Sequence, residues 1–320
     1  MNSNRFLQTL DTAANLVRQT FNGWTTPRFF IQFSAGFDLD GLFDDTPQTL
    51  ALHHLPDMPD DHTPDNHLPT LLFGRCAGVP VLVAHGHRHL FEGLGPRPCI
   101  LPTCCAWRLG TPACLFVDPV LGLRQECKTG SLTLLTDFVN GHAVSPLDGL
   151  LRMLPQPFPD MTGALSQYLI SELVNALTQA QAQPRLCVYK ALPGAHFCTP
   201  AEADAARAGH ADIVGHDLVM EIITAHALER QTAAIGVVAG MAPDGAVRPL
   251  RRAAILETCR FCSPTLMRGL RLACAEIWRD DTAGHASVLP EATADEALFQ
   301  DFRRPSGREP ALKRFLKKRD

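Results

Sequence analysis

The sequence predicts a single α/β domain built on a central mixed β-sheet flanked by helices. Short apolar segments of strand length alternate along the chain with longer segments of helical periodicity, which is the pattern of strands joined by helices. Hydrophobic residues make up 46% of the 320 residues, so the chain can bury a sizeable core. We expect the domain to span residues 1–285, and a C-terminal extension with a basic tail to span residues 286–320.

The first part of the domain begins with a helix and a buried strand. Apolar residues recur at helical spacing over residues 4–21 and predict an amphipathic helix. Residues 28–33 predict a buried strand that ends in the turn Ser34–Phe37, where small residues allow a ligand to approach the backbone. Residues 44–69 are rich in Asp, Pro and His, and they predict an irregular surface excursion.

The rest of the domain alternates strands and helices. Residues 71–74 and 79–84 predict a hairpin of two short strands. Residues 113–117 predict an apolar strand that stops at Asp118-Pro119, because proline has no N–H to donate. The other predicted strands are residues 131–139, 186–190, 213–215 and 233–239. The other predicted helices are residues 97–110, 163–181, 202–208 and 218–228.

Charge and composition argue against several classes of protein. The formal net charge of -4 provides no basic field for a nucleic acid. No apolar run reaches the roughly 18–20 residues that cross a bilayer. The N-terminus lacks the apolar core and small-residue cleavage site of a secretory signal. We therefore expect a cytoplasmic protein that binds neither nucleic acid nor membrane.

The eleven cysteines do not form a disulfide framework, because they are odd in number and scattered through apolar settings. We expect most of them to be small buried hydrophobic residues in a reducing compartment. Cys259 and Cys262 form a single CxxC without the second pair that a structural zinc site needs, so such a site is not favoured. The basic residues after Asp301 are typical of a solvated tail, with a polyanion or partner contact as the alternative.

The stretch Val79–Gly93 is the strongest candidate for a chemical site. It runs from a buried strand into a turn and carries His85, His87 and His89 at alternate positions, which share one face if the segment stays extended. Histidine titrates near neutrality and is the commonest metal ligand, so the pattern indicates acid–base or metal chemistry. The spacing alone is equally consistent with a solvated, histidine-rich loop.

Several motifs follow one another between residues 5 and 280. They are Phe33–Gly36, His67 with Leu71–Gly74, Gly86–Gly93, Gly130–Leu132 with Thr136–Asn140, Ser145–Leu147, Pro193–Glu202, and Ala211–Asp217 with Glu221. In order and spacing they resemble the trimeric purine nucleoside phosphorylase family, within the nucleoside phosphorylase and hydrolase superfamily. The resemblance implies one phosphorylase-like α/β domain, a homotrimer, and a site at the strand ends where phosphate attacks the anomeric carbon of a nucleoside.

The resemblance also implies a phosphate site, but most of its residues differ in this chain. The positions that match the family are Ser34, His67 and His89. The family's arginine is replaced by His87, which lacks a permanent bidentate cation. A stretch that offers a backbone N–H is replaced by Asp118–Gly122, in which Pro119 has none. A later serine is replaced by Asp217, whose negative charge opposes anion binding, so we do not expect phosphorolysis in its usual form.

The substrate-facing positions implied by the resemblance are partly kept. Phe197 remains as an apolar wall, whereas the glutamate that grips the purine is replaced by Cys198, a weaker acceptor. The motif tyrosine becomes Phe91, and the ribose-contacting histidine falls near Arg251 or Arg252. The other positions expected to bind substrate are Asp118, Tyr189, Glu202 and His216.

Three hypotheses about this site stay open. In the first, the protein cleaves a nucleoside or related N-glycoside without phosphate, with Asp217 or a neutral histidine as the general base for water. In the second, a divalent transition metal such as zinc replaces the phosphate. Its predicted ligands are His67, His87, His89 and Asp217. In the third, a catalytically degraded relative keeps the fold for a binding or regulatory role.

Ordinary phosphorolysis of a purine nucleoside is the remaining alternative to these hypotheses. Under each enzymatic hypothesis the protein is a glycosyltransferase or nucleosidase whose partner is a small nucleoside-like substrate. The candidate catalytic residues are Ser34, His67, His87, His89 and Asp217.

Overall fold

The computed structural model of the chain describes residues 3–59, 68–244 and 249–282. The chain divides into two units, Met1–Ala275 and Glu276–Asp320, and the first unit holds the α/β fold. The predicted extension at residues 286–320, with its basic tail, lies outside the described residues. Among the helices that are described, none combines the length and apolar character needed to cross a membrane.

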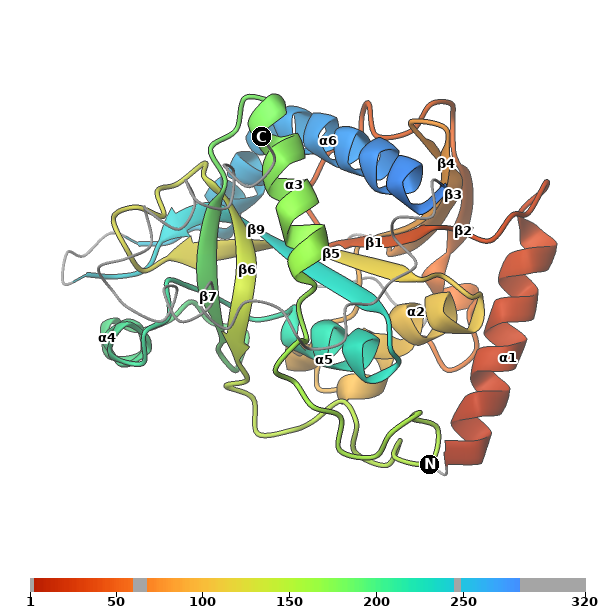
Figure 1. Cartoon of the computed structure of the whole chain (residues 1–320). Helices are drawn as coiled ribbons and strands as arrows, with labels where there is room; N and C mark the ends of the chain where they lie inside the picture. Colours follow the sequence, from red (N-terminus) through yellow and green to blue (C-terminus); the bar gives the residue numbers. More distant parts are fainter. Residues whose placement is uncertain (1–2, 60–67, 245–248, 283–320) are drawn as a thin grey trace. The chain divides into compact units, whose positions relative to one another are not determined.

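A mixed sheet forms the centre of the first unit (Figure 1). Its strands run in the order β2-β3-β4-β1-β5-β8-β7-β6-β9, and β5 also pairs with β9. The additional pairing closes β5, β8, β7, β6 and β9 into a ring, with β1 to β4 extending from one side of β5. The strands are β1 (Phe29–Phe33), β2 (Gln48–Ala51), β3 (Thr70–Cys76), β4 (Val79–His85), β5 (Ala113–Gly122), β6 (Leu132–Val139), β7 (Arg185–Ala191), β8 (Ile213–Gly215) and β9 (Gln231–Met241).

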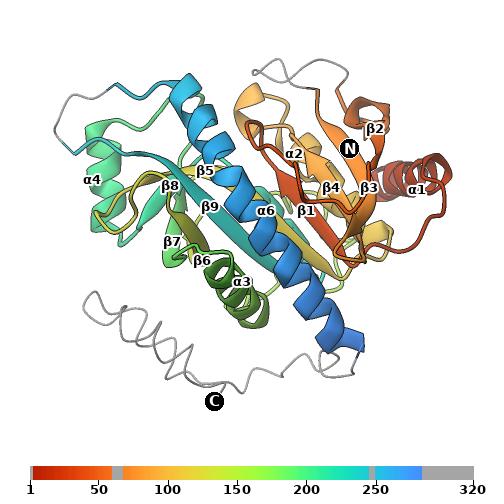
Figure 2. The same cartoon turned by 90° about the horizontal axis from the view of Figure 1, so that it is seen from above.

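Helices lie on both faces of this sheet, as the sequence predicts. Figures 1 and 2 show α2 and α5 on one face of the central strands, and α3 with the first part of α6 on the other. The helices are α1 (Ser3–Thr20), α2 (Pro96–Arg108), α3 (Gln167–Gln179), α4 (Pro200–Ala208), α5 (Val219–Ala227) and α6 (Arg252–Thr282), with the short 3-10 helices η1 (Leu52–His54) and η2 (Leu90–Glu92).

The central strands β4, β1 and β5 are parallel, and this arrangement positions the candidate site. Phe33 at the end of β1 lies opposite His85 of β4 on one side and Val117 of β5 on the other. The carboxyl ends of parallel strands meet at the same edge of a sheet. The segments after His85 and Phe33 therefore meet the second half of β5 at one edge.

Strand β5 is longer than the sequence predicts, because it continues through Asp118-Pro119 to Gly122. The backbone N–H and C=O groups of successive residues point to opposite neighbouring strands, so the backbone of Pro119 points to the same side of β5 as the backbone of Val117. The Val117 carbonyl accepts the Ser34 N–H on the β1 side, and β1 ends at Phe33. The missing N–H of Pro119 thus falls where the neighbouring strand has already ended, which is where a strand tolerates proline.

Three other parts of the chain differ from the prediction. The excursion at residues 44–69 contains β2, which pairs with β3 as an edge strand. Helix α3 begins at Gln167 rather than residue 163, because Ser166 caps it by accepting the Leu169 N–H. No helix is predicted for residues 240–282, yet α6 forms there, and apolar residues along it, such as Ile255, Cys259 and Leu266, are buried. The predicted hairpin is confirmed by the antiparallel pairing of β3 with β4.

The glycine in the turn after β1 is required by the approach of α6, while Ser34 and Ala35 of the same turn line a cavity. Gly36 has a φ of +98°, and a Cβ atom there would lie 2.6 Å from Cδ2 of Leu256 in α6. Glycine is therefore required both by the backbone conformation and by the close approach of α6. Helix α6 approaches this turn, and its first residues line the same cavity as Ser34.

All eleven cysteines are buried free thiols, which confirms their predicted role as small core residues. Cys259 and Cys262 lie within α6, and the thiol of Cys262 donates to the Gly130 carbonyl. Among the described residues, neither belongs to a cluster of side chains that could hold a metal ion.

Candidate active site

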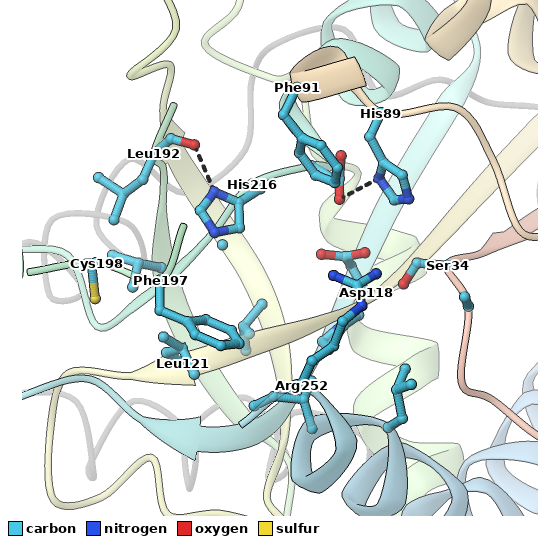
Figure 3. A pocket seen from close by; sticks show the side chains of 18 residues that line it. Ser34, His89, Phe91, Asp118, Leu121, Leu192, Phe197, Cys198, His216 and Arg252 are labelled. Atoms are coloured by element: carbon cyan, nitrogen blue, oxygen red, sulfur yellow. Dashed lines mark hydrogen bonds and ion pairs between the residues drawn. The ribbon is translucent and has the colours of Figure 1, made fainter. Parts of the chain in front are cut away.

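A cavity lies at the edge where the segments after β1, β4 and β8 meet β5 (Figure 3). Its walls also include the loop before α4 and the first turns of α6. The lining residues include Ser34, His89, Phe91, Asp118, Pro119, Leu121, Leu192, Phe197, Cys198, Val214, His216, Asp217 and Arg252. Figure 3 shows two distinct ends, with His89, Asp118 and Ser34 at one and Leu121, Leu192, Phe197 and Cys198 at the other.

The polar end is organised by an ion pair between His89 and Asp217. Nδ1 of His89 lies 2.9 Å from Oδ2 of Asp217, and the two side chains are only 6% and 11% exposed. Burial alone would lower the pKa of His89, but the Asp217 carboxylate raises this pKa to about 9. Burial would raise the pKa of Asp217, but the His89 imidazolium holds it well below its usual range. Both groups are therefore charged at neutral pH.

The backbone around Asp217 is strained. Leu218 has a φ of 72° and a ψ of -45°, and the Val219 N–H donates to the Asp217 carbonyl at 2.9 Å. This is a γ-turn of the rare type that L residues adopt only at a cost in energy. The hydroxyl of Tyr189 donates to the same Asp217 carbonyl at 2.7 Å. The surrounding structure thus fixes the direction in which the Asp217 carboxylate points.

The β8 register explains why two carboxyl groups meet in this cavity. Strand β8 runs antiparallel to β5, with Val214 opposite Leu121. In an antiparallel pair, a step forward on one strand corresponds to a step back on the other. Asp217, three residues after Val214, therefore lies near Asp118, which is three residues before Leu121. Burial, together with the charge of Asp217, raises the pKa of Asp118 well above its ordinary value.

Asp118 and Ser34 supply buried polar atoms to the cavity. Asp118 is 2% exposed and Ser34 is 4% exposed. Within the described part of the chain, Oδ1 of Asp118 and Oγ of Ser34 meet no partner in good hydrogen-bond geometry, although the Ser34 hydroxyl lies near enough to the Asp118 carboxylate to oppose the rise of its pKa. Buried polar atoms are almost always satisfied, so two such atoms lining one cavity indicate a place for a polar ligand or water. Arg252, at the start of α6, points into the cavity toward Asp118 (Figure 3).

The turn that carries His89 is held by a buried pair that the sequence analysis did not single out. The Glu92 Oε1 atom accepts the His89 N–H at 2.6 Å, and its Oε2 atom lies 2.6 Å from Nη2 of Arg88. Arg88 is only 2% exposed. The His89 ring then stacks on Phe91 with the two centroids 4.6 Å apart. The sequence signal that could have indicated this pair is an arginine within a histidine-rich motif. The burial of Arg88, however, could not be predicted from the sequence.

His87 lies behind the cavity and does not line it. It is 3% exposed, and its Nδ1 atom donates to the Arg88 carbonyl at 3.0 Å. Burial and the neighbouring charge of His89 lower the pKa of His87 to about 4, so the ring is neutral. Glu221 lies 3.7 Å from the same nitrogen and accepts a hydrogen bond from Gln32. Burial and the charge of Asp217 raise the pKa of Glu221 to about 8.

The apolar end contains some of the predicted substrate-binding residues and excludes others. Phe197, Cys198 and His216 line the cavity. Glu202 does not, because its carboxylate accepts the Thr199 N–H and caps α4. Tyr189 is fully buried beneath Asp217. His85 turns away from the site, with its Nε2 atom 3.0 Å from the Phe37 carbonyl. His67 lies outside the described residues.

Comparison with known proteins agrees with the resemblance seen in the motifs. Residues 48–268 match the model of the phosphorylase superfamily. The chain belongs to the phosphorylase superfamily. It is 25% identical over 249 residues to purine nucleoside phosphorylase 1 of Bacillus subtilis (strain 168), a match that covers 78% of this chain and 91% of the relative. It is 26% identical to purine nucleoside phosphorylase 1 of Geobacillus stearothermophilus, over 81% of this chain and 94% of the relative.

Solved structures show the same fold. A purine nucleoside phosphorylase of Schistosoma, determined in complex with hypoxanthine, aligns with a TM-score of 0.76 at 19% identity, over 87% of this chain and 99% of that chain. A Schistosoma mansoni purine nucleoside phosphorylase in complex with adenosine aligns equally well, with a TM-score of 0.76. The predicted phosphorylase-like α/β fold is therefore confirmed.

Within this superfamily fold, three of the four predicted metal ligands come together. His87, His89 and Asp217 each offer one ligand atom, and these atoms lie within 4.8 Å of one another. The Nδ1 atoms of both histidines already form hydrogen bonds, to Arg88 and to Asp217. A metal ion would therefore have to use the Nε2 atoms or displace one of these bonds.

We predict that Asp217→Asn lowers the pKa of His89 from about 9 to near or below about 6.5, the ordinary histidine value. The reason is that burial, which disfavours the imidazolium, then acts without the opposing carboxylate. The measurement is an NMR titration of the histidine ring signals in chelator-dialysed protein, with His89 assigned by comparison with His89→Gln.

The control for this titration is Asp204→Asn, because the Asp204 side chain on α4 is 74% exposed and forms its ion pair with Arg207, away from the cavity lining. That variant is expected to leave the His89 midpoint unchanged. A midpoint that stays near 9 in Asp217→Asn would show that another group holds the proton on His89.

Proposed function

We propose that this protein cleaves the N-glycosidic bond of a nucleoside-like substrate with water, not phosphate, as the nucleophile. The bond type follows from its superfamily and from relatives named purine nucleoside phosphorylase. The choice of water as the nucleophile rests on Asp118. This buried carboxyl group lines the cavity, and its Oδ1 atom has no partner in good hydrogen-bond geometry within the described part of the chain. Water can donate a hydrogen bond to this oxygen without adding charge, whereas a phosphate dianion would bring two negative charges beside the carboxyl groups of Asp118 and Asp217.

The charges at the polar end of the cavity support this choice. Asp118 and Asp217 both line it, and a carboxylate within about 4–6 Å disfavours a second anion. The positive charge of His89 is already paired with Asp217 at 2.9 Å. His87 is neutral and withdrawn from the cavity, and Pro119 has no N–H to donate. Arg252 is the remaining lining cation among the described residues, and it points toward Asp118.

The same groups can perform hydrolysis. Ser34 Oγ and Asp118 Oδ1 hold a water molecule, and the ionised Asp118 accepts its proton as the water attacks the anomeric carbon. A carboxyl group with a raised pKa is a stronger base once ionised, which suits a general base that works near neutral pH. As the glycosidic bond breaks, positive charge develops on the sugar. Asp118 and Asp217 lie at the end of the cavity where this charge is stabilised.

We expect Asp118→Asn to reduce kcat/KM by about 10²–10⁴-fold, the usual contribution of a general base. The assay is a panel of nucleosides and related N-glycosides followed by chromatography, with and without phosphate and with ribose as the expected sugar product. Turnover in the wild-type protein should be independent of phosphate. Asp204→Asn on the exposed face of α4 is the matched control and should retain full activity.

Two outcomes of this assay would contradict the proposal. Turnover that requires phosphate and yields a sugar phosphate would restore the ordinary phosphorolytic activity. An absence of turnover for every N-glycoside tested, in protein that is folded by circular dichroism, would favour the catalytically degraded relative with a binding or regulatory role.

A metal-assisted form of the same hydrolysis is the second candidate. The observation that favours it is the convergence of His87, His89 and Asp217 within 4.8 Å. Imidazole and carboxylate ligands suit zinc and similar ions. This candidate predicts near-stoichiometric metal in untagged protein by elemental analysis and a loss of activity after dialysis against a chelator. Metal-free protein that retains full activity would exclude it.

The superfamily resemblance also supports a homotrimer. Exposed apolar side chains gather in residues 139–158, between β6 and α3, where Phe158 is 86% exposed and Leu151 is 43% exposed. Such side chains are typical of an interaction surface. We expect a mass of three chains by light scattering coupled to gel filtration. A monomeric mass at micromolar concentration would contradict this assembly.

A further inference from the structure

Two buried thiols outside the cavity lie next to each other. The Sγ atoms of Cys127 and Cys187 are 3.5 Å apart, although the two residues are separated by 60 positions in the sequence. Cys127 is 3% exposed and Cys187 is 2% exposed. Neither of them lines the cavity, and the proposed hydrolysis uses neither thiol. Adjacent thiols can lose two electrons together and form a disulfide.

Cys127 lies in the turn that follows β5, and this turn is at the surface. Its neighbours Glu126 and Lys128 are both exposed, so Cys127 is a buried residue within an exposed segment. The turn is closed by a local hydrogen bond from the Cys127 N–H to the Arg124 carbonyl at 3.0 Å. Surface turns of this kind open locally at a small cost in free energy, which gives a small oxidant access to the thiol.

Cys187 is fixed inside the sheet. It lies in β7 opposite Leu135 of β6, and its carbonyl accepts the Thr136 hydroxyl at 3.3 Å. The next residue, Val188, donates its N–H to the Asp212 carboxylate at 2.8 Å. The Cys187 thiol therefore keeps its place when the turn opens and closes. A thiol held beside a reactive cysteine in this way is suited to resolve its oxidised form.

Cys127 is also more acidic than other buried thiols of the chain. The hydrogen bond with the Cys187 thiol lowers the pKa of Cys127, although burial opposes this change. In contrast, burial raises the pKa values of Cys105 and Cys114 to about 12. The thiolate is the form that reacts with oxidants, so Cys127 is more reactive than these two cysteines.

We propose that Cys127 and Cys187 are a redox-sensitive pair that a peroxide converts reversibly into a disulfide. The Cys127 thiolate attacks one oxygen of hydrogen peroxide and becomes a sulfenic acid, and the released hydroxide takes up a proton to form water. The Cys187 sulfur then attacks the Cys127 sulfur, and the departing hydroxide takes the Cys187 proton to form a second water. Two electrons thus pass from the sulfur atoms to the peroxide.

Formation of this disulfide affects the support of Asp217. The two sulfur atoms approach each other by about 1.5 Å, because a disulfide bond is about 2.05 Å long. Tyr189 follows Cys187 by two residues in β7 and donates its hydroxyl to the Asp217 carbonyl at 2.7 Å. A shift of β7 toward Cys127 therefore reaches Asp217, whose carboxylate pairs with His89.

The test treats untagged protein with hydrogen peroxide, blocks the remaining thiols with N-ethylmaleimide in denaturant, and maps the peptides by mass spectrometry without reduction. We expect a linked pair of peptides that contains Cys127 and Cys187, and a loss of two free thiols from the eleven present. Dithiothreitol should restore both thiols.

Two variants accompany this experiment. Cys127→Ser should keep its other thiols free under the same treatment. Cys262→Ala is the matched control, because the Cys262 thiol donates to the Gly130 carbonyl close to the same turn. That variant should form the same disulfide as the wild-type protein. By NMR, the His89 ring signals should shift when the wild-type protein is oxidised and stay in place in peroxide-treated Cys127→Ser.

Three results would contradict this inference. Retention of all eleven free thiols at a peroxide concentration that oxidises glutathione would overturn it. Oxidation of Cys127 to a sulfinic acid without a link to Cys187 would do the same. Unchanged His89 signals in the disulfide form would overturn the connection to Asp217. All three are read from the wild-type protein without an activity assay, so they are decided independently of the folding of the variants and of the proposed function.

Discussion

The buried ion pair between His89 and Asp217 is the interaction on which the rest of the site depends. It joins two segments 128 residues apart, at a distance of 2.9 Å. Loss of one partner from a buried pair costs about 3–5 kcal/mol, because the other charge is left uncompensated. Different contacts hold each of the two partners in place. Arg88 and Glu92 hold the turn that carries His89, and a strained γ-turn with the Tyr189 hydroxyl holds Asp217.

Burial and the charge of this pair together set the protonation of its neighbours. Burial, helped by the imidazolium of His89, keeps His87 neutral, and burial, helped by the carboxylate of Asp217, raises the pKa values of Asp118 and Glu221. The carboxyl groups of the site are thus separated into one ionised member, Asp217, and two members with raised pKa values. Such a separation is how active sites assign acid and base roles to side chains of the same type.

The cavity has one end lined by charged and polar groups and one end lined by apolar groups. Carboxyl groups line one end and apolar side chains line the other, so positive charge is favoured at one end and a neutral ring at the other. The end with the carboxyl groups opposes a phosphate dianion, because the positive charge of His89 is already paired with Asp217. The proposed hydrolysis rests on this division of charge.

Much of the fold could be predicted from the sequence alone, because apolar periodicity depends on local order in the chain. The strands and the hairpin of β3 and β4 were predicted in this way. His89 was singled out by the histidine spacing together with the family resemblance, and Asp217 by the resemblance alone; the structure places the two side chains 2.9 Å apart. The continuation of β5 through Pro119 was decided by the tertiary structure, since proline is tolerated there only because β1 ends at Phe33. Packing in the folded chain likewise decides that Arg252 lines the cavity and that His87 and Glu202 do not. Sequence shows which side chains are available, but burial and partners set their charge, and these depend on segments that meet only in the folded chain.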